Sequence, residues 1–198
     1  MLAALLLLAL TPFARAADEA AAPVDEDLAR YVDPMIGTFA PGFVFPGASV
    51  PFGMVQNSPD TYGEFAYSGY LWSDPTIGGF SLVHLNGPGV KKAGDLPFMP
   101  VSGPIVPGLD LASPYDHVTE SASPGSYSVV LSRYATKVEL TAGLRTGQQR
   151  YTFPTGVPGQ VGPADGGGRH AAHREAVVAE LDVVGGGLEQ VGREPDRL

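Results

Sequence analysis

The stretch Phe45–Gln56, FPGASVPFGMVQ, places two proline–glycine breaks, Pro46-Gly47 and Pro51-Phe52-Gly53, around a short apolar segment. Proline fixes φ and has no N–H to donate, whereas glycine permits backbone angles that other residues resist. A helix is therefore excluded here, and we predict a folded-back backbone that leads into a short strand at 54–56. A second loop of the same character, Gly78–Asp95, carries short polar side chains. We expect the two loops to meet on one face of a β-domain.

The composition favours an all-β chain that does not bind nucleic acid. At 198 residues the chain has room for one or two domains, and its 26 glycines and 19 prolines favour turns over helices. A net charge of −9 argues against a nucleic-acid partner, because phosphate binding needs clustered Lys and Arg. The absence of cysteine excludes disulfides and a thiol nucleophile.

The N-terminus predicts export. Residues 2–10 form an apolar run that is too short to span a bilayer comfortably, and Ala14-Arg15-Ala16 supplies the small-x-small pattern of a signal-peptidase site. We therefore predict a signal peptide at 1–16 and a flexible leader at 17–30. The mature protein would be secreted or periplasmic, with no membrane contact after cleavage.

The clearest periodicity in the chain predicts a β-hairpin. Tyr127, Val129 and Leu131 share one face of a strand, and Val138 and Leu140 share a face of the next. Bulky residues are expected inward and small or polar residues outward.

Other segments are interpreted from their proline, glycine and apolar content. Tyr31–Thr38 predicts a short edge strand or bend, because Pro34 cannot donate to a central ladder. Ser58–Thr61 carries a turn signal, and 96–101 and Gln148–Phe153 each predict a strand.

The composition changes after Pro154. Tyr, Phe and Trp disappear, Gly, Ala, Val, Arg and Glu dominate, and strand alternation stops. His170 and His173 lie three residues apart, but they would need a stable helix to share a metal, so no metal ligand is assigned. We predict that 155–198 is a disordered or marginally ordered tail.

Aromatic residues are concentrated between Tyr62 and Trp72. Most of these rings are expected to lie at the edge of a β-core. Trp72 is the exception, because it lies in a turn beside Ser73-Asp74-Pro75, where its flat ring suits the apolar C–H face of a sugar. Earlier in the chain, we expect Phe43 and Phe45 to anchor their loop by burial.

The loop that follows His84 has the character of a binding loop. Asn86 and Asp95 lie on a glycine-rich backbone, and short polar side chains of this kind suit hydroxyl groups, which both donate and accept hydrogen bonds. Alternatively, His84 is a hydrogen-bonded structural residue beside the apolar Leu82-Val83.

A glycosidase usually needs two carboxyl groups, one acid and one base or nucleophile. The loop carboxylates available are Asp60, Glu64, Asp74 and Asp95, and the sequence does not pair any two of them. They also suit a purely local role, in which Asp side chains bond their own backbone in turns. No residue of this chain is assigned as catalytic.

Several motifs occur along the chain in a recognisable order. They are VDPMIGT (32–38), FPGASVPFGMVQNSPD (45–60), IGGFSLVHLNGPG (77–89), GDLPFMP (94–100), ESASPGSYSVVL (120–131) and VELTAGLRTGQQRYTFP (138–154). Together they resemble the N-terminal domain of glycoside hydrolase family 92, the calcium-dependent, inverting exo-α-mannosidases, over residues 31–154.

The resemblance implies an antiparallel β-sandwich of the galactose-mutarotase-like type, here incomplete and followed by a low-order tail. It also implies that mannose-containing glycans are the substrate, and that the general acid, the general base and most calcium ligands lie on a C-terminal (α/α)₆ catalytic domain. By motif position, Trp72, His84, Asn86 and Asp95 are the candidates for substrate binding. The family usually carries a Thr-His-Leu-Ser-Gly type segment where this chain reads VHLNG at 83–87.

The sequence therefore predicts the substrate-pocket portion of an exported α-mannosidase, inactive by itself because the acid and base lie elsewhere. The alternatives are a stand-alone carbohydrate-binding module and a non-functional gene fragment. A frameshift would explain why the resemblance, the aromatic residues and the strand periodicity all end near Pro154.

Overall fold

The computed structural model describes residues 27–41, 43–87, 97–106, 108–164 and 180–184. In chain order its elements are η1 (Leu28–Tyr31), β1 (Ala48–Ser49), β2 (Gln56–Asp60), β3 (Thr76–Ile77), β4 (Gly79–Ser81), β5 (Phe98–Ser102), β6 (Ser113–Pro114), η2 (His117–Thr119), β7 (Ser121–Ser123), β8 (Ser126–Leu131), β9 (Thr136–Ala142), β10 (Gly147–Thr152), β11 (Gly159–Pro163) and β12 (Glu180–Val184). Apart from the short 3₁₀ turns η1 and η2, the regular structure of these residues is β, as the sequence predicts. No helix in these ranges is long and apolar enough to cross a bilayer.

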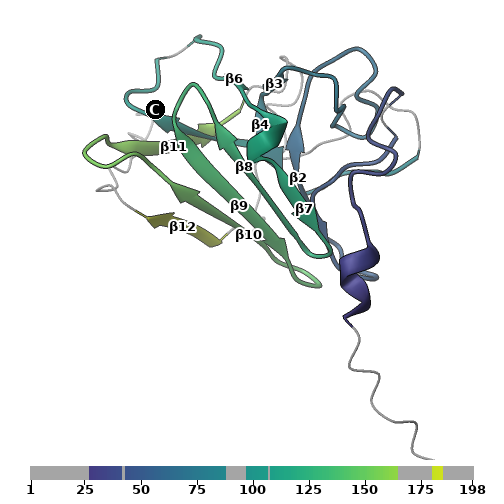
Figure 1. Cartoon of the computed structure of the whole chain (residues 1–198). Helices are drawn as coiled ribbons and strands as arrows, with labels where there is room; N and C mark the ends of the chain where they lie inside the picture. The colour runs from purple at the N-terminus through teal and green to yellow at the C-terminus, as the bar shows by residue number, and fades with distance from the viewer. Residues whose placement is uncertain (1–26, 42, 88–96, 107, 165–179, 185–198) are drawn as a thin grey trace, which may run out of the picture.

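One sheet is built on the predicted hairpin and has the strand order β12-β10-β9-β8-β7 (Figure 1). In β8 and β9, Tyr127 pairs with Leu140 and Val129 pairs with Val138. Burial alternates along both strands, so the large apolar side chains face the interior. The hairpin and the strand predicted at Gln148–Phe153, found as β10, are confirmed. Among the described strands, β12 departs from antiparallel pairing, because it runs parallel to β10.

The second sheet has the order β1-β2-β4-β5-β11, and β3 and β6 form a separate two-stranded ribbon. The strand predicted at 96–101 is confirmed as β5. Gly47 explains how the opening stretch folds back onto this sheet: a Cβ on Gly47 would lie 2.2 Å from the Asn57 carbonyl oxygen. Only glycine permits such a close backbone approach.

The two sheets enclose one apolar core. The sheet of β4 and β5 contributes Phe80 and Met99, and the hairpin sheet contributes Val129, Leu140 and Tyr151, all fully buried. Figure 1 shows the hairpin sheet lying across the shorter strands behind it. The fold is thus the predicted β-sandwich.

A buried amide pair also joins the two sheets. Asn57 of β2 accepts a hydrogen bond from the Gln149 side chain of β10 at 2.7 Å. Its own amide nitrogen donates to the carbonyl oxygens of Thr141 and Gln148 at 3.1 and 3.0 Å. Buried polar groups of this kind must be bonded, so the pair fixes the register of one sheet against the other.

Three local predictions were wrong in whole or in part. The strand expected at 54–56 begins only at its last residue, Gln56, where β2 starts. Tyr31–Thr38 is not an edge strand: η1 ends at Tyr31, and a turn follows at 34–37, which agrees with the alternative of a bend; there Met35 N–H donates to the Asp33 carboxylate. Ser58–Thr61 is not a turn, because Ser58, Pro59 and Asp60 belong to β2 and pair with β4. Pro59 is tolerated within the strand because β1 ends its pairing at Asn57 and requires no N–H from Pro59.

The residues beyond Pro154 begin with a strand that sequence alternation did not predict. β11 pairs with β5 through the register Gly159↔Ser102 to Pro163↔Phe98. Its sequence, GQVGP, has little strand propensity, so backbone pairing rather than side-chain pattern defines it. The remainder of the predicted tail lies outside the described residues, except for β12. The predicted signal peptide, and all of the predicted leader except 27–30, also lie outside them.

Candidate functional site

The two proline- and glycine-rich loops meet, as the sequence predicts. Gln56 N–H donates to the Leu82 carbonyl at 3.0 Å, and the Gln56 carbonyl lies 2.8 Å from His84 Nδ1. The rings of Phe45 and His84 are 5.2 Å apart, and Phe45 N–H donates to Asn86 Oδ1 at 3.4 Å. The N-terminal loop is therefore held directly against the loop that carries two of the predicted site residues.

The His84 side chain lies buried between the two loops rather than at their surface. It is fully buried, and Nε2 lies 3.0 Å from Asp60 Oδ1. The other Asp60 oxygen accepts a hydrogen bond from Ser81 at 2.5 Å. Since Ser81 donates to the carboxylate and not to the imidazole, the trio is not a nucleophile–base pair. Both His84 nitrogens therefore lie within hydrogen-bond distance of a protein oxygen atom.

Gly69 shows how closely the backbone packs against His84. Gly69 has φ +91°, and a Cβ there would lie 2.7 Å from His84 Cδ2. These contacts favour the structural alternative for His84, and its sugar-binding role stays a prediction. Asn86 is exposed at the loop surface, whereas Asp95 lies outside the described residues.

Trp72 contacts the beginning of the segment 38–45, at the end opposite to Phe45. Its indole is half-buried and stacks on the His117 ring, with centroids 3.5 Å apart and planes inclined by 10°. Phe39 approaches the indole at 5.3 Å, and Trp72 N–H donates to the Thr38 carbonyl at 3.0 Å. The segment 38–45 thus contacts Trp72 at its beginning and His84 at its end.

An aromatic-lined cleft opens along this segment. We call it the aromatic cleft; it has a volume of about 540 Å³ and is lined by Ala40, Pro41, Phe43, Phe65 and Tyr67. Phe43 stacks on Tyr67 at 5.2 Å, and the Phe65 side chain is 49% exposed. The sequence predicted Phe43 to be buried and placed Phe65 and Tyr67 at the core edge, and the structure corrects these three assignments. The absence of strand alternation between 62 and 72 was the available signal.

Two of the candidate carboxylates, Asp60 and Asp74, are engaged with protein groups. Asp74 accepts a hydrogen bond from Gly63 N–H at 2.8 Å, the local turn role that the sequence allowed. Glu120, which sequence reasoning missed, is buried and accepts hydrogen bonds from Tyr70 and Tyr127 at 2.8 and 2.6 Å. Burial, followed by the nearby Glu120 charge, raises the pKa of both phenols, so they remain donors.

The calcium that the resemblance implies can be tested against these side chains. Within the described ranges, no three His, Asp or Glu side chains gather closely enough to hold an ion. Asp60 and Glu120 are occupied by their protein donors. The described acidic and His side chains therefore do not fit a calcium site on their own.

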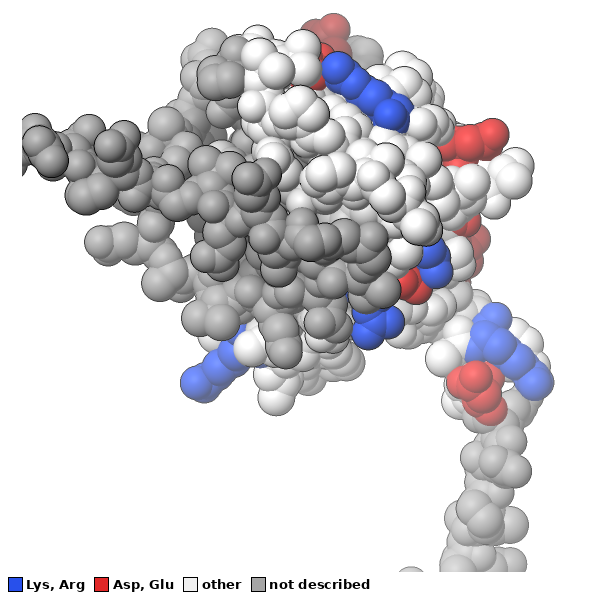
Figure 2. Space-filling model, turned by 90° about the vertical axis from the view of Figure 1, so that its left-hand side faces the viewer, with Lys and Arg blue, Asp and Glu red and all other residues white. Residues whose placement is uncertain are grey.

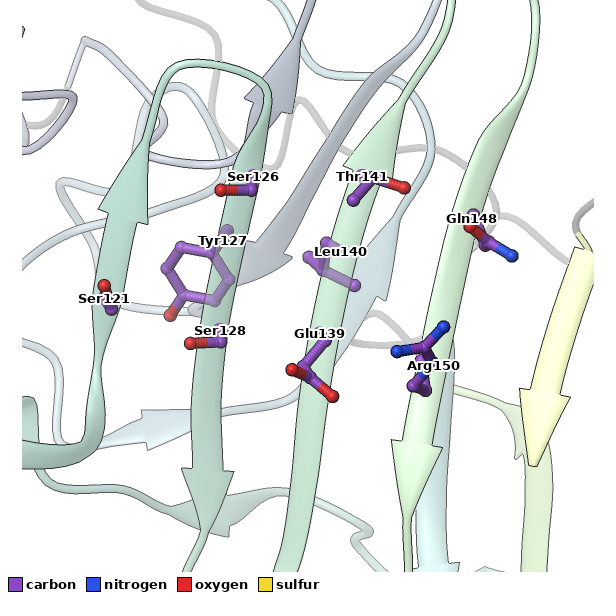
Figure 3. Close-up of a pocket in the computed structure, with 9 residues that line it drawn as sticks. All are labelled: Ser121, Ser126, Tyr127, Ser128, Glu139, Leu140, Thr141, Gln148 and Arg150. Atoms are coloured by element: carbon purple, nitrogen blue, oxygen red, sulfur yellow. The ribbon is translucent and has the colours of Figure 1, made fainter. Parts of the chain in front are cut away.

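A second, polar hollow lies on the outer face of the hairpin sheet. We call it the polar groove; it has a volume of about 230 Å³ and is lined by Ser121, Ser126, Tyr127, Ser128, Glu139, Leu140, Thr141, Gln148 and Arg150. Figure 3 shows its serine, glutamate and arginine side chains, which project from the neighbouring strands β7, β8, β9 and β10. The groove has no exposed ring, because Tyr127 is only 2% exposed. Figure 2 shows Lys and Arg side chains scattered singly over the face that it draws.

The comparisons with known proteins agree with this architecture. The glycosyl hydrolase family 92 N-terminal domain matches residues 31–179, so the chain belongs to this family through that domain. The match extends beyond Pro154, where the resemblance noted from motifs ended.

The solved structures that resemble this chain belong to the same family. A family GH92 alpha-mannosidase from Bacteroides thetaiotaomicron, BT3965, solved in complex with mannoimidazole, is 42% identical with a TM-score of 0.61, over 66% of this chain and 18% of that one. The gh92 family glycosyl hydrolase ccman5 is 30% identical with a TM-score of 0.60, over 67% of this chain and 20% of that one.

A curated relative, described as an uncharacterized secreted glycosidase of Arthroderma benhamiae, is 40% identical over 81 residues, which cover 40% of this chain and 10% of the relative. The chain therefore spans a fifth or less of the length of these relatives.

Proposed function

We propose that this chain supplies part of the substrate pocket of an exported α-mannosidase that acts on terminal α-mannosides of glycans. The observation that carries the proposal is the loop segment 38–45, which holds the half-exposed Trp72 indole at one end and opens into the aromatic cleft. Binding sites for small ligands combine apolar and aromatic walls with a few oriented polar groups. Figure 1 shows the loops of this region, drawn in blue, lying beside the sandwich.

In this proposal Trp72 contacts the apolar face of the mannose ring. Asn86, exposed at the neighbouring loop surface, and Asp95 contribute hydrogen bonds to hydroxyl groups. His84 contributes indirectly, because its contacts with Gln56, Asp60 and the Phe45 ring hold the segment 38–45 in place.

The reactive half of the pocket is proposed to lie on an (α/α)₆ catalytic domain that carries the acid, the base and most calcium ligands. Exposed apolar side chains support a docking role for this part of the chain: Phe65, which lines the aromatic cleft, is 49% exposed, and Phe39, which packs against Trp72, is 60% exposed. Exposed apolar surface can mark an interaction site. The chain by itself is expected to be inactive in hydrolysis.

The test combines a binding and a turnover measurement on the 198-residue chain. Calorimetric titration with methyl α-D-mannopyranoside is expected to give heat of binding that Trp72→Ala abolishes and that Leu144→Ala leaves unchanged. Leu144 is a matched control because it is an exposed apolar residue in the β9–β10 turn.

Hydrolysis of a nitrophenyl α-mannoside, with and without added calcium, is measured beside the titration. Binding without turnover supports the pocket role, and turnover would show that the acid and base lie on this chain. Absence of both would contradict the proposal and favour a non-functional fragment.

A further inference from the structure

The contact between Trp72 and His117 is unusually specific for a surface loop. The two rings are nearly parallel at 3.5 Å, closer than the usual separation of aromatic pairs. His117 Nε2 also lies 2.9 Å from the Trp72 carbonyl oxygen. The imidazole therefore holds both the side chain and the backbone of the same residue.

The opposite side of the imidazole is fixed by a buried carboxylate. His117 Nδ1 lies 2.6 Å from Glu120 Oε2, and the Glu120 side chain is only 2% exposed. The other Glu120 oxygen accepts hydrogen bonds from Tyr70 and Tyr127. Because charge-assisted hydrogen bonds are short and strong, His117 has little freedom to rotate.

These contacts connect the Trp72 indole to the buried core of the sandwich. Tyr127 belongs to β8 and is buried in the main core. η2, which carries His117, is itself capped by Asp116, whose side chain accepts from Val118 N–H at 2.9 Å. The orientation of the Trp72 indole is thus tied to the hairpin sheet through two side chains, His117 and Glu120.

We propose that His117 is a positioning residue that holds the Trp72 indole in its sugar-binding orientation, with Glu120 anchoring His117 to the sheet. The inference rests on the proposed function of Trp72 and extends it to the residues behind the ring. A ring that is already ordered loses less conformational freedom when a ligand binds, so pre-organisation increases affinity.

Trp72 is the single tryptophan of the chain, so its fluorescence reports on this contact alone. In His117→Ala, we expect faster local motion of the indole in time-resolved anisotropy and a red-shifted emission. Affinity for methyl α-D-mannopyranoside, followed by the same fluorescence, is expected to fall about three- to tenfold, the cost of ordering one side chain.

Val118→Ala is the matched control. Val118 lies next to His117 in η2, and its side chain is 91% exposed, so neither emission nor affinity should change. His117→Phe keeps a ring against the indole but loses both hydrogen bonds, and an intermediate mobility is expected. Tyr127→Phe removes one hydrogen bond to Glu120 without touching Trp72, and it should give a smaller change in mobility and affinity in the same direction. If His117→Ala fails to fold, His117→Phe and Tyr127→Phe test the inference in its place.

Each remaining outcome contradicts the inference in a distinct way. Unchanged indole mobility in His117→Ala would show that His117 does not hold the ring. Weaker binding with unchanged mobility would mean that His117 contacts the sugar itself, and altered mobility with unchanged binding would mean that the contact is only structural. Absence of mannoside binding in the wild type overturns the proposed function and the sugar role of His117 with it, although the mobility comparison still tests the ring contact.

Discussion

The hairpin sheet and the loops at 38–41, 43–47 and 61–75 are built by different means. In β8 and β9, apolar and polar residues alternate, and burial follows this alternation residue by residue. In these loops, order comes from a few polar contacts between residues far apart in the sequence, such as the hydrogen bond from Trp72 N–H to the Thr38 carbonyl.

The difference separates the part of this protein that carries the core from the part that we propose to bind sugar. The alternating strands need only their side-chain pattern to bury a core. The loops leave aromatic rings at the surface, and rings on positioned loops are suited to binding. Changes in the sheet should therefore reduce stability, and changes in the loops should alter recognition with little loss of stability.

The largest effect is expected in the sheet. Leu140→Ala removes a fully buried side chain of β9 and should lower the free energy of unfolding by about 2–5 kcal/mol. Thr141→Ala, at the neighbouring exposed position, should change it by no more than about 0.5 kcal/mol. Urea denaturation of both variants measures the difference, and equal losses would contradict the alternation argument.

The next effect concerns the amide pair between the sheets. Asn57→Ala removes the 2.7 Å acceptor of the Gln149 amide, leaves it only the Phe80 carbonyl at 3.4 Å, and should cost about 1–3 kcal/mol. Gln148→Ala serves as the control, because that side chain lines the polar groove. Denaturation midpoints that shift equally in the two variants would show that the pair does not join the sheets.

Alkaline pH should weaken the fold through its buried tyrosines. Burial raises the pKa of Tyr70, Tyr115, Tyr127 and Tyr151. An unfolded phenol ionises near pH 10, so the stability from each group is complete below about pH 10 and is lost as the pH rises above it. Tyr127→Phe should reduce the slope of unfolding free energy against pH by up to about 1.4 kcal/mol per unit, measured between about pH 9 and pH 11. Identical slopes in the two proteins would contradict the assignment.

The smallest effect on stability is expected in the aromatic cleft. Phe43→Ala removes the ring stacked on Tyr67 and should cost about 0.5–1.5 kcal/mol. Phe52 has a fully exposed side chain, so Phe52→Ala should cost nothing measurable. Thermal denaturation compares the two, and a large loss in Phe43→Ala would place that ring in the core.

The sequence predicted the sheet better than the loops for a physical reason. Period-two alternation defines the hairpin locally, so the hairpin was found from the residues alone. β2 was missed because Pro59 and Asp60 are typical of turns, whereas here the strand depends on pairing with β4. β11 was missed because backbone pairing with β5 defines it.

The candidate site shows the same limit. Trp72 and the loop of His84 could be identified from residue type and glycine-rich context. His117 and Glu120 could not, because their importance arises from contacts with Trp72 and Tyr70, 45 and 50 residues away. Neither residue lies in a motif that indicates such a contact.

The most direct test of the account is an NMR titration of the ¹⁵N-labelled 198-residue chain with methyl α-D-mannopyranoside. We predict that the indole N–H signal of Trp72 and the backbone amides of segment 38–45 shift together, while the amides of β8 and β9 stay in place. Shifts centred on the polar groove, at Ser128 and Glu139, or no shifts at all, would contradict the assignment of the loops as the sugar-binding surface.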